Sequence, residues 1–407
     1  MNCRHCAAPL QHTFLDLGFA PPSNAYLSAE DLSRPEKTFP LRVKVCHHCW
    51  LVQTEDYAQA DELFSADYAY FSSTSSSWLA HARAYCAQMT ERLGLGPHSH
   101  VVEVAANDGY LLRNFVASGI PCLGIEPTAS TAAAAQALGI PVLREFFGEA
   151  LGQRLAAHGQ QADLIAGNNV YAHVPDINDF TRGLAALLKP EGVVTLEFPH
   201  LMRLIEHTQF DTVYHEHFSY LSLGAVSRIF AAAGLRVWDV EELPTHGGSL
   251  RIYGCLAAAQ HRTTGRVSQL LVQEENAGLM QLATYTGFQA RADKVKNDLL
   301  FWLLEQKRAG RRVAAYGAAA KGNTLLNYAG VKPDLLSYVC DAAPAKQGKY
   351  LPGSHVLVLA PAALRQDQPD FVLILPWNIA AEVRTQLADL AEQSVKFVTA
   401  VPTLSIK

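Results

Sequence analysis

The sequence lacks the features that mark nucleic-acid-binding and membrane-spanning proteins. Its 407 residues carry a formal net charge of -5 and contain no basic block, so we expect no nucleic-acid partner. No apolar run reaches the length needed to span a membrane, and no cationic leader precedes an apolar segment. We therefore expect a soluble cytoplasmic protein with no membrane partner, and we expect it to act as a monomer.

Charged residues and cysteines are also scarce. Only 17% of the residues are charged whereas 49% are hydrophobic, which is enough for real cores and argues against disorder. A chain of this length is expected to divide into two or three domains. Eight cysteines in such a chain do not suggest a disulfide framework. Four of them occur in two close pairs, which indicates a metal site and a reducing compartment.

The two close pairs are CxxC motifs separated by a long loop. Each pair can present two thiolates to one tetrahedral ion, and two pairs complete a four-thiolate shell. The loop is longer than in a minimal zinc ribbon, so we expect a small subdomain within it. Chance cysteines in a reduced protein are the alternative, but they would not easily give two pairs at equal spacing. We predict a structural zinc ion without a catalytic role, because a closed shell leaves no open position, and its ligands are Cys3, Cys6, Cys46 and Cys49.

Residues 57–78 carry aromatic side chains first and hydroxyl side chains afterwards. The serine and threonine run suits the N-cap of a helix predicted over residues 78–93. The aromatic content suggests a lid or the wall of a site, and a packed linker is the alternative.

Residues 100–126 have the pattern of a nucleoside-binding βαβ unit. An apolar strand leads through a turn and a helix to a second strand that ends at Glu126. An acid at that position can accept hydrogen bonds from both ribose hydroxyls. Of the dinucleotide glycine pattern only Gly109 remains, which favours S-adenosylmethionine over NAD because no pyrophosphate has to be held. An α/β unit without a ligand is the alternative.

A second nucleotide-type unit is predicted near the C-terminus, after mostly helical residues 262–308. A strand over residues 312–317 leads there to a helix that begins near Lys321 and Asn323. Free N–H groups at a helix start favour phosphate, so we expect these two side chains to contact a nucleotide. A plain α/β domain with a solvent-exposed lysine is the alternative.

The segment from Tyr214 to Tyr220 is dense in groups that exchange protons near neutral pH. We hypothesise that it is catalytic and that His217 is the general base, since the adjacent Glu216 can orient a histidine. In an extended chain His215 and His217 lie on the same side, so the residues alone do not decide between them. A strand with polar groups on its open face is one alternative. A metal site that includes upstream histidines is another, although no cysteine or carboxylate pattern completes it.

Taken in order, these motifs resemble those of the sugar C-methyltransferases that act on nucleotide-linked deoxy-keto-sugars, typified by 3-C-methyltransferases. The resemblance covers essentially the whole chain. Its motifs are the four paired cysteines and residues 101–112, 168–175, 214–217, 245–251 and 315–324.

The resemblance implies an α/β fold with three parts. The zinc-binding module and the lid segment take residues 1–77. A Rossmann-like domain over residues 78–255 binds S-adenosylmethionine. A second Rossmann-like domain over residues 256–407 binds the sugar, linked to dTDP or to another nucleotide, and the reaction takes place between these two domains.

The resemblance also implies the roles of individual residues, with His217 as the base. The expected catalytic residues are His217, Glu216, Tyr214, His173 and Tyr68. The expected cofactor-binding residues are Glu103, Ala105, Asn107, Gly109, Glu126, Phe147 and Asn168. The expected substrate-binding residues are Lys321, Asn323, Gly317, Arg251 and Ser249. One departure affects the lid, where the serine-glycine pair usual in the family is Ser72-Ser73 here.

The expected reaction is C-methylation at C3 of a 4-keto-deoxysugar. A base removes the proton from the carbon beside the ketone, and the resulting enolate carbon attacks the sulfonium methyl group. The ketone already acidifies its neighbour, so no metal is required. A sugar O- or N-methyltransferase is the alternative enzyme, and a nucleotide-sugar-binding regulatory protein is the alternative without catalysis.

Overall fold

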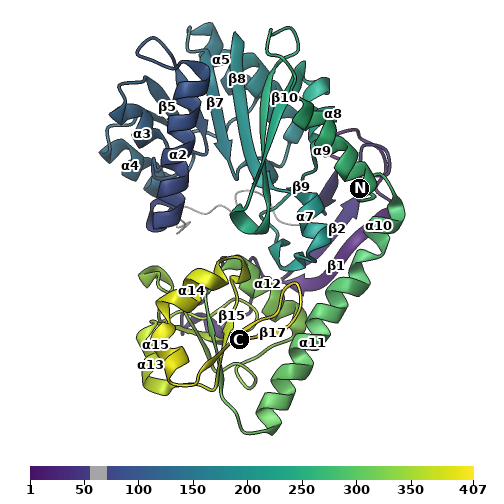
Figure 1. The fold of residues 1–407 in the computed structure, drawn as a ribbon, viewed down its shortest axis with the longest axis vertical. Helices are drawn as coiled ribbons and strands as arrows, with labels where there is room; N and C mark the ends of the chain where they lie inside the picture. Colours follow the sequence, from purple (N-terminus) through teal and green to yellow (C-terminus); the bar gives the residue numbers. More distant parts are fainter. Residues whose placement is uncertain (56–70) are drawn as a thin grey trace.

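A computed structural model describes residues 1–55 and 71–407 of the chain, and it contains three β-sheets (Figure 1). The predicted lid residues from 57 to 70, Tyr68 included, lie outside the described residues. Among the described residues, no helix is long and apolar enough to cross a membrane.

The N-terminal sheet has the strand order β1-β2-β3-β9 and is antiparallel throughout. Strands β1 and β2 lie in the loop between the two cysteine pairs, where a subdomain was expected, and β3 follows the second pair directly. The fourth strand comes from far along the chain, directly after His217 and Phe218. The bounds are β1 (His12–Ala20), β2 (Phe39–Val45), β3 (Val52–Thr54) and β9 (Ser219–Tyr220).

The central sheet has the strand order β10-β11-β8-β7-β4-β5-β6. Strands β4 to β8 run parallel, and β11 pairs antiparallel with both β8 and β10. Strand β4 is buried at every position, as a parallel strand covered by helices on both faces should be. The bounds are β4 (Val101–Val104), β5 (Cys122–Ile125), β6 (Val142–Leu143), β7 (Ala162–Asn168), β8 (Leu188–Pro199), β10 (Leu235–Leu243) and β11 (Ser249–Leu256).

Helices cover this central sheet and lie between its strands in the sequence (Figure 1). Chain order reverses at β4, because its neighbours β5 and β7 lie on opposite sides of it. The carboxyl ends of the strands at such a reversal form the usual ligand crevice of an open α/β sheet. The bounds are α2 (Ser76–Leu93), α3 (Leu112–Ala117), α4 (Ala129–Ala137), α5 (Glu149–Ala157), α6 (Ile177–Leu187), α7 (Leu201–Glu206) and α8 (Leu223–Ala232).

The C-terminal sheet repeats this plan with the strand order β14-β13-β12-β15-β16-β17. All of its pairs are parallel except β16 with β17. The bounds of its strands are β12 (Val313–Tyr316), β13 (Tyr338–Cys340), β14 (Leu357–Leu359), β15 (Phe371–Ile374), β16 (Lys396–Thr399) and β17 (Ser405–Ile406). The bounds of its helices are α12 (Ala320–Ala329), α13 (Ala362–Asp367), α14 (Ala380–Gln386) and α15 (Ala388–Glu392).

Helices α9 (Gly265–Asn276), α10 (Leu282–Thr286) and α11 (Phe288–Arg308) connect the two larger sheets. Helix α11 runs along one edge of the molecule and spans roughly 30 Å (Figure 1). Near its start Phe288 stacks on Phe14 of β1, with ring centroids 4.6 Å apart. Near its end Trp302 meets Phe371 of β15 edge to face at 5.3 Å. The N-terminal and C-terminal sheets therefore share one hydrophobic core.

Candidate active site

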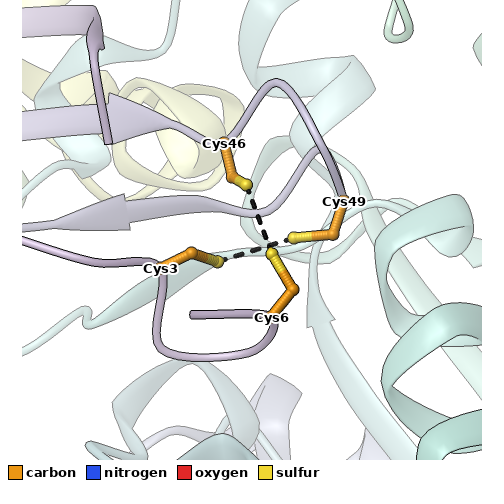
Figure 2. Close-up of side chains that lie close together, drawn as sticks. All are labelled: Cys3, Cys6, Cys46 and Cys49. Carbon is orange, nitrogen blue, oxygen red and sulfur yellow. Dashed lines mark hydrogen bonds between the residues drawn. The ribbon is translucent and has the colours of Figure 1, made fainter. Parts of the chain in front are cut away.

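The four paired cysteines come together as predicted (Figure 2). Their sulfur atoms all lie within 4.8 Å of one another, and the Cys3–Cys49 and Cys6–Cys46 sulfur pairs are each 3.5 Å apart. The two knuckles have the same backbone geometry, because the residue after each pair, Ala7 or Trp50, has a positive φ and donates its N–H to the carbonyl of the first cysteine. This four-thiolate arrangement suits a tetrahedral zinc ion and leaves no open position for catalysis.

The first knuckle also supports the segment that contains His217. The guanidinium of Arg4, between the two cysteines, donates to the carbonyls of Phe218 and Thr54. The hydroxyl of Thr54 donates to the carbonyl of His217 at 3.3 Å. Strand pairing between β3 and β9 adds to these bonds. The zinc module therefore holds the backbone on which the proposed base is mounted.

The loop after β4 takes the conformation expected of a glycine-rich cofactor loop. Ala105, Asn107 and Gly109 all have positive φ, at 60°, 49° and 77°. Left-handed backbone costs roughly 1–2 kcal/mol at a non-glycine residue, so the surrounding contacts must hold it. One such contact runs from the Asn107 N–H to the Glu126 carboxylate at 2.9 Å, and another from the Ser72 N–H to the Asn107 side chain at 3.0 Å.

The other predicted cofactor-binding residues lie around this loop but differ in what they can offer. Glu126 is at the end of β5, whereas Glu103 is within β4 and fully buried. Burial raises the pKa of Glu103 well above its ordinary value, and the nearby Glu126 and Asp108 raise it further. Asn168 ends β7, and neither polar atom of its amide has a partner among the described residues. Phe147 is half-buried against Phe180.

His217 lies in a tight turn rather than in a strand, so the expected extended segment is wrong. The His217 N–H donates to the carbonyl of Tyr214 at 3.0 Å. This turn gives the two histidines different contacts, because His215 Nε2 lies 3.3 Å from the carbonyl oxygen of Phe39 and His217 Nδ1 lies 3.1 Å from that of Thr212. The assignment of the base to His217 rather than to His215 stays a prediction.

The tautomer of His217 suits a base. Its Nδ1 lies 3.1 Å from the carbonyl oxygen of Thr212, which can only accept, so Nδ1 carries the proton and Nε2 keeps its lone pair. Burial holds the pKa of His217 well below its ordinary value, and neighbouring His173 lowers it further. The imidazole is therefore neutral near pH 7, which is the state a proton acceptor requires.

Aromatic side chains surround the His217 ring. The ring of Tyr214 lies 4.0 Å away and that of His173 lies 4.5 Å away, edge to face. Burial lowers the pKa of His173 to about 4, so this imidazole is also neutral near pH 7. Three of the predicted catalytic residues thus meet in one place.

Glu216 does not pair with His217. Both of its carboxylate oxygens accept from the Asn24 amide, at 3.1 and 2.9 Å. Burial raises the pKa of Glu216 to about 7 although this bond lowers it. Asn24 belongs to the zinc module, and no pattern marked it as a site residue, because an asparagine after Pro-Pro-Ser is typical of a turn.

The C-terminal unit presents Lys321 beside this segment. The Lys321 ammonium donates to the side chain of Asn378 at 2.7 Å and lies 4.9 Å from the centroid of the Trp377 ring. The Trp377 indole in turn donates to Asp211 at 2.7 Å, just upstream of Tyr214. Burial raises the pKa of Asp211 to about 6, against the opposing effect of Lys321. Sequence reasoning missed Asp211, Trp377 and Asn378.

Asn323 and Gly317 lie near Lys321 but have structural contacts of their own. The Asn323 amide donates to the carbonyl of Ser23 at 2.6 Å and is buried, so it fastens α12 to the zinc module. Its side-chain oxygen has no partner among the described residues. Gly317 has a φ of 91°, and a Cβ there would come within 2.3 Å of Pro376. Any contact of these two residues with substrate would use the Asn323 oxygen or the Gly317 backbone.

Arg251 and Ser249, which were expected to bind the substrate, have contacts within the protein, and a substrate role for them stays a prediction. Arg251 is buried in the central sheet, where it donates to Glu197 at 2.8 Å and to Glu241 at 3.1 Å. The Ser249 hydroxyl donates to the carbonyl of Thr245 at 3.0 Å. These bonds stabilise the sheet and the turn that follows β10, whereas the Arg251 Nε has no partner among the described residues.

Comparison with known proteins agrees with this geometry. Three family models match in chain order, a zinc binding domain at residues 3–64, a methyltransferase domain at residues 78–240 and a C-methyltransferase C-terminal domain at residues 244–402. The C-methyltransferase NovU of Streptomyces niveus is 34% identical over 401 residues, which cover 98% of this chain and 95% of NovU.

Two solved methyltransferase structures each match less than half of the chain. The magnesium protoporphyrin IX methyltransferase ChlM of Synechocystis PCC 6803, with bound S-adenosylmethionine, is 14% identical, covers 43% of this chain and 78% of its own, and has a TM-score of 0.33. An S-adenosylmethionine-dependent methyltransferase of Clostridium acetobutylicum is 10% identical, covers 48% of this chain and 95% of its own, and has a TM-score of 0.35. The NovU match spans nearly the full length of both chains, and on that ground this chain belongs to the C-methyltransferase family, as a zinc-binding enzyme that uses S-adenosylmethionine.

Proposed function

We propose that the enzyme methylates C3 of a 4-keto-deoxysugar linked to a nucleotide. The observation that carries this proposal is the state of His217, a buried neutral imidazole whose proton is fixed on Nδ1 and whose Nε2 is free to accept. Removing a proton from carbon requires such a base, whereas the more acidic groups of O- and N-methylation substrates demand less of it.

S-adenosylmethionine, bound at the carboxyl ends of β4, β5 and β7, supplies an electrophilic methyl group. Glu126 accepts the ribose hydroxyls, and the backbone of Ala105, Asn107 and Gly109 approaches the ligand closely. Glu103, Phe147 and Asn168 complete this site. Asn168 contributes the amide that has no partner among the described residues.

The sugar lies between this loop and the C-terminal unit. His217 takes the proton from C3, and the electron pair left on that carbon forms the bond to the methyl group. Tyr214 and His173 flank the base and hold the ring in orientation, and Glu216 accepts from a sugar hydroxyl. Tyr68 is the further catalytic residue implied by family resemblance.

The nucleotide binds to the C-terminal unit through Lys321, with the Asn323 oxygen and the Gly317 backbone as further contacts. A partly buried ammonium at the start of α12 suits a diphosphate. The zinc-binding part at residues 1–77, the cofactor domain at residues 78–255 and the nucleotide domain at residues 256–407 then act together, in an enzyme that works as a monomer.

Proton exchange at C3 tests this proposal. The purified protein is incubated in deuterium oxide with dTDP-, GDP-, CDP- and UDP-linked 4-keto-deoxysugars, and the label at C3 is followed by NMR and mass spectrometry. We expect exchange with one of these sugars, and a C-methylated product when the methyl donor is added. Methylation at oxygen or nitrogen without exchange would instead identify an O- or N-methyltransferase.

A further inference from the structure

The turn between β10 and β11 contains a histidine to which no role has been assigned. His246 lies in the 3-10 turn Thr245–Gly247 with a φ of 54°. The next residue, Gly247, leaves no room for a side chain, because a Cβ would come within 2.4 Å of the Trp377 ring. The turn is therefore wedged between the central sheet and the C-terminal unit. Strained backbone held in this way is characteristic of functional sites.

His246 is surrounded by groups of the proposed site. Its ring lies 5.5 Å from Trp78, which in turn stacks on Tyr110 of the cofactor loop. The Asn169 amide, directly after Asn168, lies 3.3 Å from His246 Nε2. Trp78 and Asn169, which lie beside the cofactor-binding residues, thus contact His246 directly. The C-terminal unit lies on the other side, where Trp377 meets the next residue, Gly247.

The proton of His246 is positioned for donation. Because the Asn169 amide nitrogen donates to Nε2, the ring proton belongs on Nδ1. No described residue accepts a hydrogen bond from this Nδ1. Burial lowers the pKa of His246 to about 4, with Lys321 and His81 lowering it and Glu197 opposing them. The ring is therefore a neutral donor with one N–H that no described residue uses.

We propose that the Nδ1–H of His246 donates to the carbonyl oxygen of the substrate and stabilises the enolate that forms when His217 removes the neighbouring proton. This inference rests on the proposed function. The proton moves from C3 to Nε2 of His217, and the negative charge moves to the carbonyl oxygen. The electron pair then returns to C3 as its bond to the methyl group forms and the carbon–sulfur bond breaks.

Lys321 is a weaker candidate for this role. Its ammonium donates to Asn378 and lies over the Trp377 ring, and the proposed function already assigns it to the diphosphate. His173 is the other neutral imidazole near the base, but its ring meets His217 edge to face and is part of the wall around that base. His246 lies on a different element, the turn between β10 and β11, and is near enough to His217 to contribute to the lowering of its pKa.

Two substitutions separate the donor from the backbone that carries it. Both His246→Gly and His246→Asn tolerate the left-handed conformation, so neither strains the turn. Asparagine places an amide nitrogen on Cγ, where Nδ1 is bonded in histidine, whereas glycine removes the donor. We expect His246→Gly to slow C3 proton exchange and methylation about a hundredfold, the usual effect of losing one oxyanion donor. In His246→Asn both rates should be at least tenfold higher than in His246→Gly.

The methyl-donor affinity, measured by calorimetry, should change less than threefold in both variants. Equal exchange rates in His246→Gly and wild type would overturn the role of His246 and leave the proposed function standing. Equal losses in the glycine and asparagine variants would also overturn it, because they would show that the turn and not the donor matters. Absence of exchange in the wild-type protein with every 4-keto sugar would contradict the proposed function, and the role of His246 with it.

Discussion

The unit built on the central sheet and the unit built on the C-terminal sheet share one hydrogen-bonding arrangement in the loop after their first strand. In the central unit, Glu126 accepts the N–H of Asn107 in the first loop and that of Thr128 two residues downstream, both at 2.9 Å. In the C-terminal unit, Asp341 accepts the N–H of Ala318 in the first loop and that of Ala343 two residues downstream, both at 2.8 Å. In each unit, an acid at the end of the second strand fastens the turn after the first.

The two crevices differ in what fills them. Near Asp341, side chains of the protein itself occupy the crevice. The Lys346 ammonium and the Tyr26 hydroxyl both donate to the carbonyl of Ala318, at 2.7 and 2.5 Å. Around Glu126 no comparable cation enters among the described residues. One topology thus has a cation of the protein beside the acid in one unit and none among the described residues in the other, so the site and not the fold decides what binds. We therefore expect the ligand contact of the C-terminal unit at Lys321, near the start of α12.

The largest expected effect comes from the zinc module, which serves both units. Removing zinc with a chelator, or by Cys46→Ser, should unfold the module, because structural zinc contributes about 10–16 kcal/mol in small zinc domains. Methylation should then fall below detection, since β3 no longer pairs with β9 behind His217. Metal analysis and activity are measured on the same samples. Full activity in a zinc-free, folded protein would contradict both the site and its connection to the base.

The substitution His217→Asn should slow methylation by about a hundredfold or more, the scale of a positioned base. Asparagine keeps an amide nitrogen where Nδ1 contacts the Thr212 carbonyl, so the turn should persist. Both ligands should still bind, as measured by calorimetry, while proton exchange at C3 is lost.

His215→Asn is the matched control for the base. Because His215 faces Phe39 rather than the site, this variant should retain most of the exchange rate. Loss of exchange in His215→Asn with retention in His217→Asn would reverse the two roles.

The pair Glu126→Ala and Asp341→Ala tests the comparison between the two units directly. Glu126→Ala should weaken S-adenosylmethionine binding roughly tenfold to a hundredfold, since each hydrogen bond to a charged acceptor contributes about 1.5–3 kcal/mol. Asp341→Ala should leave that affinity unchanged. Calorimetry with the methyl donor alone measures both, and equal losses in the two variants would show that these acids act only on the fold.

The smallest effect is expected at Lys321. Lys321→Ala should weaken binding of the nucleotide sugar about tenfold and leave the methyl donor unaffected, because we expect the ammonium to contact the nucleotide and not the methyl donor. Lys346→Ala is the matched control, since Lys346 is bound within its own crevice. A greater loss of sugar-nucleotide affinity in the Lys346 variant would place the nucleotide in the crevice beside Asp341 instead.

The sequence predicted those elements whose signal lies within a short stretch of the chain. The apolar runs of β4, β5 and β12 and the equal spacing of the CxxC pairs were sufficient for the strands and the metal site. The pairing of β9 with β3 was not predictable, because two residues have no periodicity and their partner lies far away in the sequence. The turn at His215 was missed for a similar reason, since a run of histidine, glutamate and tyrosine contains no glycine or proline to mark it.

The site was predicted less completely than the fold. Cysteine and histidine candidates stood out by their chemistry, whereas Asn24, Asp211 and Trp377 are ordinary residues until tertiary structure brings them to Glu216 and Lys321. His246 had one usable signal, the two glycines that follow it, because such a pair marks a turn. The contacts of Arg251 with Glu197 and Glu241 were not predictable from its motif, because these partners lie on other strands.

The pairing of β9 with β3 bears on recombination between related enzymes. A crossover placed near residue 78 would exchange the zinc module while leaving behind Ser219 and Tyr220, the strand that completes its sheet. Chimaeras that preserve the catalytic turn must therefore transfer residues 1–55 together with residues 210–222, as two inserts from one parent. This small sheet therefore constrains how such enzymes can diversify, because the zinc module and the segment that carries the base must be inherited together.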